Sequence, residues 1–211
     1  MLWRHGLTPW NAQRRFQGQT DVALDSVGVE QAERAARLLA ALQPDVLVSS
    51  DLQRAAATAA ALARVTGLEV ARDPGLRETM AGAWQGLTSA EIAERFPGEV
   101  EAWAAGDVHL RPGGGETRLE VADRTVAAVR RALERVPEGG LLVAATHGGA
   151  ARVAIGQLLG LPPSCWGALG GLSNCCWSVL AEPAPGSRDG AWRLLEHNAG
   201  SLPQPVLTEE G

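Results

Sequence analysis

Short apolar runs alternate with amphipathic stretches through most of this chain, and this alternation limits the possible fold more than any other feature. Residues 45–48 and 141–145 have the composition of buried strands, whereas residues 25–42 place apolar side chains at helical spacing. Strands separated by helices predict a parallel sheet, because parallel neighbours need a long crossover connection. We therefore expect an α/β fold with three layers, α/β/α, in which helices flank a mostly parallel central sheet.

Capping residues and glycines indicate where the helices begin and end. Asp25 or Ser26 can begin one helix, Gly67 can end another, and capping boxes start at Thr88 and Thr117. The expected helices are 26–42, 52–65, 117–135 and 149–159, with short helices in an irregular stretch from 72 to 115. The expected strands are 2–3, 45–48, 68–70 and 141–145, followed by a hairpin of 177–180 and 192–195. The first strand is so short that it is expected to brace the residues after it weakly.

Length and composition narrow the class of protein. The 211 residues predict a single domain, residues 1–211, with a frayed tail at 203–211. There is no apolar run of membrane-spanning length and no charged-then-apolar leader, so we expect a cytoplasmic protein that does not bind membranes. The three cysteines lack zinc-site spacing and are expected to be buried, reduced thiols.

Charge argues against one class of partner. The net charge is −5, and all 19 basic residues are arginines that form no block. Nucleic-acid binding is therefore not expected as the main task. Any site for an anion must be built locally from a few arginines.

Polar residues follow the ends of the expected strands. Arg4 and His5 follow the first strand, Arg54 follows the second, Glu78 lies beyond the third, and His147 follows the fourth. Ligands of open α/β sheets bind at the carboxyl ends of parallel strands, so these side chains are expected to converge there. The helices that begin near residues 52 and 149 should direct their positive ends to the same place. Together these groups predict a site for a dianionic phosphate.

The residue types suit attack on phosphorus. An imidazole at His5 can act as the nucleophile, and the planar fork of Arg4 can hold phosphoryl oxygens. A carboxyl group at Glu78 would repel a phosphate when ionised, but when protonated it can donate to a leaving alkoxide. From these residues alone, two alternatives stay open: an ordinary polar turn at residues 4–6, and a structural ion pair between Glu78 and an arginine.

A series of longer motifs resembles the phosphoglycerate mutase-like branch of the histidine phosphatase superfamily. The matching stretches lie in family order between residue 2 and about residue 200 and include RHGLTPWN at 4–11, FQG at 16–18, SSDL at 49–52, LRE at 76–78, GAWQGLT at 82–88, PGGGET at 112–117 and THGG at 146–149. The resemblance implies a phosphoglycerate mutase-like fold and a phosphatase without metal or cofactor.

The same resemblance implies a role for each matching residue. His5 would form a phosphohistidine, and Glu78 would donate a proton to the leaving group and then help to activate water. Arg4, Arg54 and His147 would hold the phosphoryl oxygens. The substrate pocket would be completed by Asn11, Gln17, Gly18 and Gly148.

Several functions remain to be distinguished. The first is a phosphomonoester hydrolase acting on a small phosphorylated metabolite, and the second is a phosphoglycerate mutase, which is disfavoured because Arg111 is the one cation between residues 99 and 115. A non-catalytic phosphate-binding module and a metal-dependent hydrolase are the others. Motifs at 166–174 and 192–198 resemble actinobacterial phosphatases of the family and suggest a sugar or glycerate phosphate, with α-ribazole phosphate or a broad substrate range as competitors. Whether the protein forms a homodimer stays open.

Overall fold

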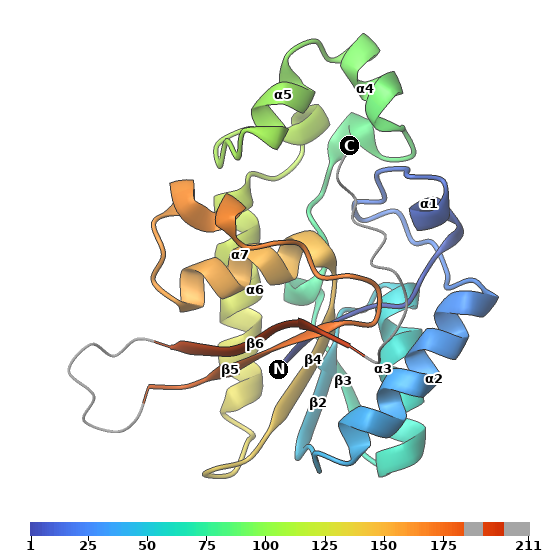
Figure 1. Ribbon diagram of the computed structural model, residues 1–211, viewed down its shortest axis with the longest axis vertical. Coiled ribbons are helices and arrows are strands. Elements are labelled where there is room, and N and C mark those ends of the chain that lie inside the picture. Colours follow the sequence, from blue (N-terminus) through green and yellow to red (C-terminus); the bar gives the residue numbers. More distant parts are fainter. Residues whose placement is uncertain (184–191, 201–211) are drawn as a thin grey trace.

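A six-stranded mixed sheet forms the centre of the computed structural model, which describes residues 1–183 and 192–200 (Figure 1). The strands are β1 (Leu2–Arg4), β2 (Val46–Ser49), β3 (Val70–Arg72), β4 (Leu142–Thr146), β5 (Trp177–Ala181) and β6 (Arg193–Ala199). Their order in the sheet is β3-β2-β4-β1-β5-β6. The strands β3, β2, β4 and β1 are parallel to one another, whereas β5 is antiparallel to both β1 and β6.

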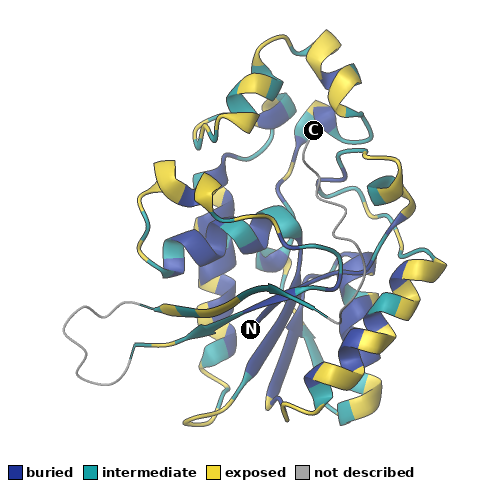
Figure 2. Ribbon diagram, viewed as in Figure 1, coloured by how far each residue is buried: buried dark blue, intermediate teal, exposed yellow. Residues whose placement is uncertain are grey.

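Helices cover both faces of the sheet, which confirms the predicted α/β/α layers. The pair α2 (Ser26–Ala40) and α3 (Gln53–Thr66) packs on one face, and the pair α6 (Arg118–Leu133) and α7 (Gly148–Leu158) packs on the other (Figure 1). The strands alternate between the two cores: Leu142 and Ala144 face α6 and α7, whereas Val143 and Ala145 face α2 and α3. The strands β1, β2 and β4 and the inner helix faces are accordingly the buried parts of Figure 2, whereas the edge strands β3 and β6 are half-buried or exposed.

Shorter elements lie beyond the carboxyl ends of the parallel strands. The helices α4 (Ser89–Arg95) and α5 (Glu99–Ala104) form an outlying cap in Figure 1, packed on Trp84 and Phe16. The rings of Phe16, Trp84 and Trp103 meet edge to face in this cap, so these tryptophans serve packing. The remaining elements are α1 (Pro9–Ala12) and the 3₁₀ helices η1 (Pro74–Leu76), η2 (Gly82–Trp84), η3 (Pro112–Gly114) and η4 (Pro163–Ala168).

The predicted caps are present. Asp25 caps α2, Gly67 ends α3 in the left-handed conformation, and capping boxes at Thr88 and Thr117 begin α4 and α6. The helix α2 is shorter than expected and ends at Ala40, because Leu42 is 52% exposed and has no core to join. The strand β3 begins two residues later than expected, since its pairing with β2 aligns Arg72 with Ser49.

The remaining predictions concern the cysteines, the end of the chain and the number of domains. Cys175 is buried as predicted, but Cys176 is only half-buried and Cys165 is exposed, so the prediction of three buried thiols is confirmed for Cys175 alone. The predicted frayed tail at 203–211 lies outside the described residues, and the single domain over 1–211 stays a prediction. Within the part of the chain that the structure describes, no helix is both long and apolar enough to span a membrane.

Candidate active site

The register of the sheet brings the two predicted histidines together. Arg4 of β1 pairs with Thr146 of β4, so the residues that follow, His5 and His147, leave adjacent strands at the same level. Their rings lie 5.1 Å apart between centroids. The convergence that we expected from strand ends is therefore a consequence of parallel pairing.

His5 is firmly held although its strand has only three residues. Its backbone N–H donates to Thr146 O (3.0 Å), and its carbonyl accepts from the backbone of Cys175 and the side chain of Asn174 (both 3.1 Å). The strand β1 lies between β4 and β5, and the His5 side chain is only 2% exposed. The expected weak bracing of His5 is thus wrong, because a short strand gains support from both neighbours.

The His5 imidazole is prepared as a nucleophile. Its Nδ1 lies 2.7 Å from the carbonyl oxygen of Gly6, which can only accept, so Nδ1 carries the proton and Nε2 carries the lone pair. Burial, together with the positive charges of Arg54 and Arg4, holds the pKa of His5 well below its usual value of 6.5. The ring is therefore neutral at neutral pH.

His147 has the opposite tautomer. Its Nδ1 accepts from Nε of Arg54 (3.2 Å), so the ring proton lies on Nε2, which donates to Oγ of Ser50 (2.9 Å). Burial and then the charge of Arg54 hold the pKa of His147 well below 6.5. Sequence reasoning gave Ser50 no role, although it follows β2 just as His5 follows β1.

Arg54 is fully buried and held by backbone carbonyls. Its Nη1 donates to Thr20 O (2.8 Å) and its Nη2 to Gly18 O (2.7 Å). Burial lowers its pKa to about 10, which leaves it charged. Gly18 adopts a positive φ of 53°, and a Cβ there would clash with the side chain of Gln85, so this turn suits glycine.

Arg4, at the end of β1, and Gly148, at the start of α7, lie beside each other. Nη1 of Arg4 donates to Leu172 O (2.6 Å), which orients the guanidinium. A Cβ on Gly148 would be 3.4 Å from Nε of Arg4, so the glycine leaves little room between helix α7 and this arginine.

Glu78 is seated on the first turn of α7. Its Oε2 accepts from Gly149 N (2.9 Å), and its Oε1 accepts from Ala150 N (2.9 Å) and Thr79 N (2.8 Å). The charge of Glu78 raises the pKa of Arg54, although burial outweighs this effect. The side chain therefore lies near the arginine but is held by backbone amides, so the structural ion pair considered from the sequence is not what positions it.

The helix amino termini differ from the expectation. They were predicted to face a phosphate directly, but each one carries a carboxylate: Asp21 accepts from Gln53 N at α3 (2.7 Å), and Glu78 accepts from α7. Helix amino termini favour any anion, and here the chain supplies it. The positive charge that faces the site comes from Arg4 and Arg54.

Asn11 and Gln17 lie in the same corner as Thr8, which sequence reasoning did not single out. Oδ1 of Asn11 accepts from the backbone N–H of Thr8 and from Nδ2 of Asn174 (both 3.2 Å), and Oε1 of Gln17 accepts from Oγ of Thr8 (3.0 Å). The structure thus places all nine predicted site residues at one edge of the sheet: Arg4, His5, Asn11, Gln17, Gly18, Arg54, Glu78, His147 and, beside Arg4, Gly148. Among residues 1–183 and 192–200, no three His, Cys, Asp or Glu side chains are grouped to hold a metal ion.

Comparison with known proteins gives a consistent result. The model of the histidine phosphatase superfamily (branch 1) matches residues 1–199. A glucosyl-3-phosphoglycerate phosphatase of Mycolicibacterium vanbaalenii is 41% identical over 213 residues, covering 95% of this chain and 94% of the relative. A probable phosphoglycerate mutase GpmB of Yersinia enterocolitica is 36% identical, covering 99% and 96%. The solved structure of a mycobacterial glucosyl-3-phosphoglycerate phosphatase with VO3 has a TM-score of 0.88 and 41% identity, covering 94% and 98%.

Proposed function

The chain belongs to branch 1 of the histidine phosphatase superfamily, and on this basis we propose that it hydrolyses phosphomonoesters through a phosphohistidine on His5, without a metal ion. The observation that carries the proposal is the state of His5. Its lone pair is on Nε2, its ring is neutral, and two arginines flank it. A neutral, oriented imidazole beside cationic donors is what attack on a phosphate dianion requires.

In the first step, Nε2 of His5 attacks phosphorus and the bond from phosphorus to the ester oxygen breaks. Arg4 and Arg54 hold the phosphoryl oxygens and stabilise the charge that develops on them. His147 adds a third donor when its single ring N–H, which donates to Ser50 in the free site, moves to a phosphoryl oxygen. The leaving oxygen takes a proton from Glu78. Oε1 of Glu78 already accepts two backbone N–H groups and Oε2 accepts one, so Oε2 has room for that proton.

In the second step, water attacks phosphorus and the bond to Nε2 breaks. The carboxylate of Glu78 takes a proton from the water, which restores both residues and releases phosphate. The corner formed by Asn11 and Gln17, with the backbone at Gly18 and Gly148, would complete the substrate pocket.

For the substrate we propose a phosphorylated sugar or glycerate derivative, with glucosyl-3-phosphoglycerate as the first candidate. Relatives with that named activity match nearly the whole chain. The mutase is the second candidate, because a relative bears that name. Arg111 does not favour it: this arginine forms an ion pair with Glu120 (2.6 Å), so it is engaged within the protein.

The cellular setting is part of the proposal. The three cysteines are free thiols, which suits a reducing compartment such as the cytoplasm. The partner is a small metabolite, and neither nucleic acid nor a membrane is included. Light scattering of the purified protein decides between a monomer and a homodimer.

The test is phosphate release from a panel of esters after treatment with a chelator. The panel contains glucosyl-3-phosphoglycerate, 3-phosphoglycerate, sugar phosphates, α-ribazole phosphate and p-nitrophenyl phosphate. We expect turnover by the wild type and none by His5→Ala. Undiminished turnover by His5→Ala would overturn the mechanism, and conversion of 3-phosphoglycerate to 2-phosphoglycerate without phosphate release would favour the mutase.

A further inference from the structure

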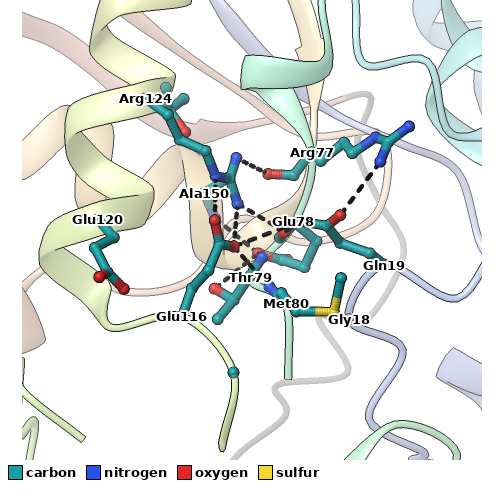
Figure 3. Close-up of polar contacts among 12 residues, drawn as sticks. Gly18, Gln19, Arg77, Glu78, Thr79, Met80, Glu116, Glu120, Arg124 and Ala150 are labelled. Carbon is teal, nitrogen blue, oxygen red and sulfur yellow. Dashed lines mark hydrogen bonds and ion pairs between the residues drawn. The ribbon is translucent and has the colours of Figure 1, made fainter. Parts of the chain in front are cut away.

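The guanidinium of Arg124, on helix α6, is saturated by the segment that carries Glu78. Its Nη1 donates to Gly75 O (2.9 Å) and Arg77 O (2.6 Å), and its Nη2 donates to Glu78 O (2.8 Å). The remaining N–H groups donate to the carboxylate of Glu116, from Nε to Oε1 and from Nη2 to Oε2 (both 2.8 Å). An arginine has five N–H donors, and all five are used here. Figure 3 shows this arrangement.

Glu116, the carboxylate partner of Arg124, binds the chain on the C-terminal side of Glu78. Its Oε2 accepts from Met80 N (2.8 Å), and its backbone N–H donates to Met80 O (2.8 Å). Oε2 also lies 3.4 Å from Nε2 of Gln19, which donates to Glu78 O (3.1 Å). The segment from Gly75 to Met80 is therefore held on both sides of Glu78 by one arginine and its carboxylate partner.

The two ends of the Glu78 residue are held by different helices. The Arg124 side chain from α6 fixes the backbone, whereas the first turn of α7 fixes the carboxylate. In the described part of the chain, the hydrogen bonds of Arg124 go to backbone carbonyls and to Glu116, and none goes to the carboxylate of Glu78. Its charge contributes to the low pKa of His147, and the variant Arg124→Lys retains that charge. The contacts of Arg124 therefore fix the position of the Glu78 backbone, whereas the hydrogen bonds of the Glu78 carboxylate come from other residues.

We propose that Arg124, supported by Glu116, is a positioning residue for Glu78. It holds the backbone of Glu78 where the Oε2 atom of the side chain can reach the leaving oxygen. The inference rests on the proposed function, because it assigns Arg124 to the proton-donor step of that reaction. A misplacement of about 1 Å is enough to slow a reaction by about 10²-fold. Lysine cannot replace the arginine, since its single ammonium group cannot reach three carbonyls and a bidentate carboxylate together.

A purely structural role predicts something else. If Arg124 served stability alone, its loss would slow all substrates alike. If it positions the proton donor, its loss slows esters with poor leaving groups most, because good leaving groups depart without a proton. Affinity for inorganic phosphate should change little in both cases, since Arg4, Arg54, His5 and His147 remain.

The experiment compares Arg124→Lys and Glu116→Gln with the wild type on an alkyl phosphate and on p-nitrophenyl phosphate. Arg131→Lys is the matched control, because Arg131 lies on the same helix and pairs with Asp73 (2.8 Å) next to the same segment, but is exposed. We expect kcat for the alkyl phosphate to fall about 10²-fold in Arg124→Lys and much less for p-nitrophenyl phosphate. Arg131→Lys should keep the wild-type ratio of the two substrates.

A double variant separates this inference from the proposed function. Adding Arg124→Lys to Glu78→Gln should cause little further loss, because the positioned group is already gone. Equal losses on both substrates in Arg124→Lys and Glu116→Gln, or a full additional loss in the double variant, would overturn the positioning role. Activity that survives His5→Ala would instead overturn the proposed function. Inorganic phosphate inhibition, measured for each variant, confirms that the folded site is intact.

Discussion

The carboxylate of Glu78 lies directly against Gly149: a Cβ on this glycine would be only 2.6 Å from Oε1 of Glu78. The same glycine donates its backbone N–H to Oε2. Its lack of a side chain therefore lets the carboxylate reach the amides of the first turn of α7. This explains why a glycine follows Gly148 at the start of that helix.

Gly149→Ala should displace the Glu78 carboxylate and weaken its hydrogen bonds to the helix. We expect kcat for alkyl phosphates to fall about tenfold or more, with little change in inhibition by inorganic phosphate. Gly167→Ala is the control, because a Cβ there meets no atom within 4 Å. Wild-type kinetics in Gly149→Ala would show that the close approach has no catalytic importance.

Replacing Glu78 itself should affect turnover according to the leaving group. In Glu78→Gln the proton donor is lost, so kcat should fall by about 10²- to 10⁴-fold for alkyl phosphates and far less for p-nitrophenyl phosphate. Steady-state kinetics across leaving groups of graded acidity measure this. A uniform loss across the series would contradict the role of Glu78 as proton donor.

Two adjacent serines allow a matched test of His147. Ser50 accepts from Nε2 of His147, whereas the hydroxyl of Ser49 donates to the carbonyl of Ser50 (2.7 Å), and both serines are fully buried. Ser50→Ala leaves the imidazole N–H without this acceptor, which costs about 1–3 kcal/mol. We therefore expect kcat/KM to fall about tenfold in Ser50→Ala and less than about threefold in Ser49→Ala. Equal effects of the two substitutions would argue against orientation of His147 by Ser50.

The two buried histidines should make stability depend on pH. In the folded protein the pKa of His5 and of His147 lies well below 6.5, whereas in the unfolded chain both take up protons near that pH. The unfolded state then binds more protons, so the free energy of unfolding falls as pH decreases below 6.5, by up to about 1.4 kcal/mol per pH unit for each histidine.

Denaturant titrations between pH 5 and pH 7.5, in buffer without phosphate, measure this slope. His5→Asn should make it shallower, whereas His109→Asn should not, because His109 is exposed. An unchanged slope in His5→Asn would show that His5 takes up its proton equally in the folded and unfolded states.

The sequence predicted the fold and the convergence of the site because both follow from local patterns. Caps and apolar periodicity located most helices, and parallel strands necessarily bring the residues after them to one edge. His5 and His147 were found in this way. The same logic applied to Ser50 would have found its contact with His147, since it follows β2 directly.

Long-range pairings were not predictable from local patterns. Asp21 lies 32 residues before the helix terminus that it caps, and Glu78 lies 71 residues before Gly149, so the occupied helix termini required the tertiary structure. Arg124 resembles its neighbouring arginines on α6 in sequence, and only its five hydrogen bonds distinguish it from the exposed Arg131. Val29 and Leu42 likewise fit the apolar spacing of residues 25–42 but are exposed, because burial depends on which elements pack against a helix and not on spacing alone.

The most direct test of the account is the trapping of a phosphoryl group on His5. The wild type is mixed with a phosphomonoester substrate, quenched within a single turnover at alkaline pH and analysed by peptide mass spectrometry. We predict a phosphoryl group on the peptide that contains His5, labile to acid and absent from His5→Ala. Turnover of the substrate with no phosphohistidine at His5, or with the phosphoryl group on His147, would contradict the account.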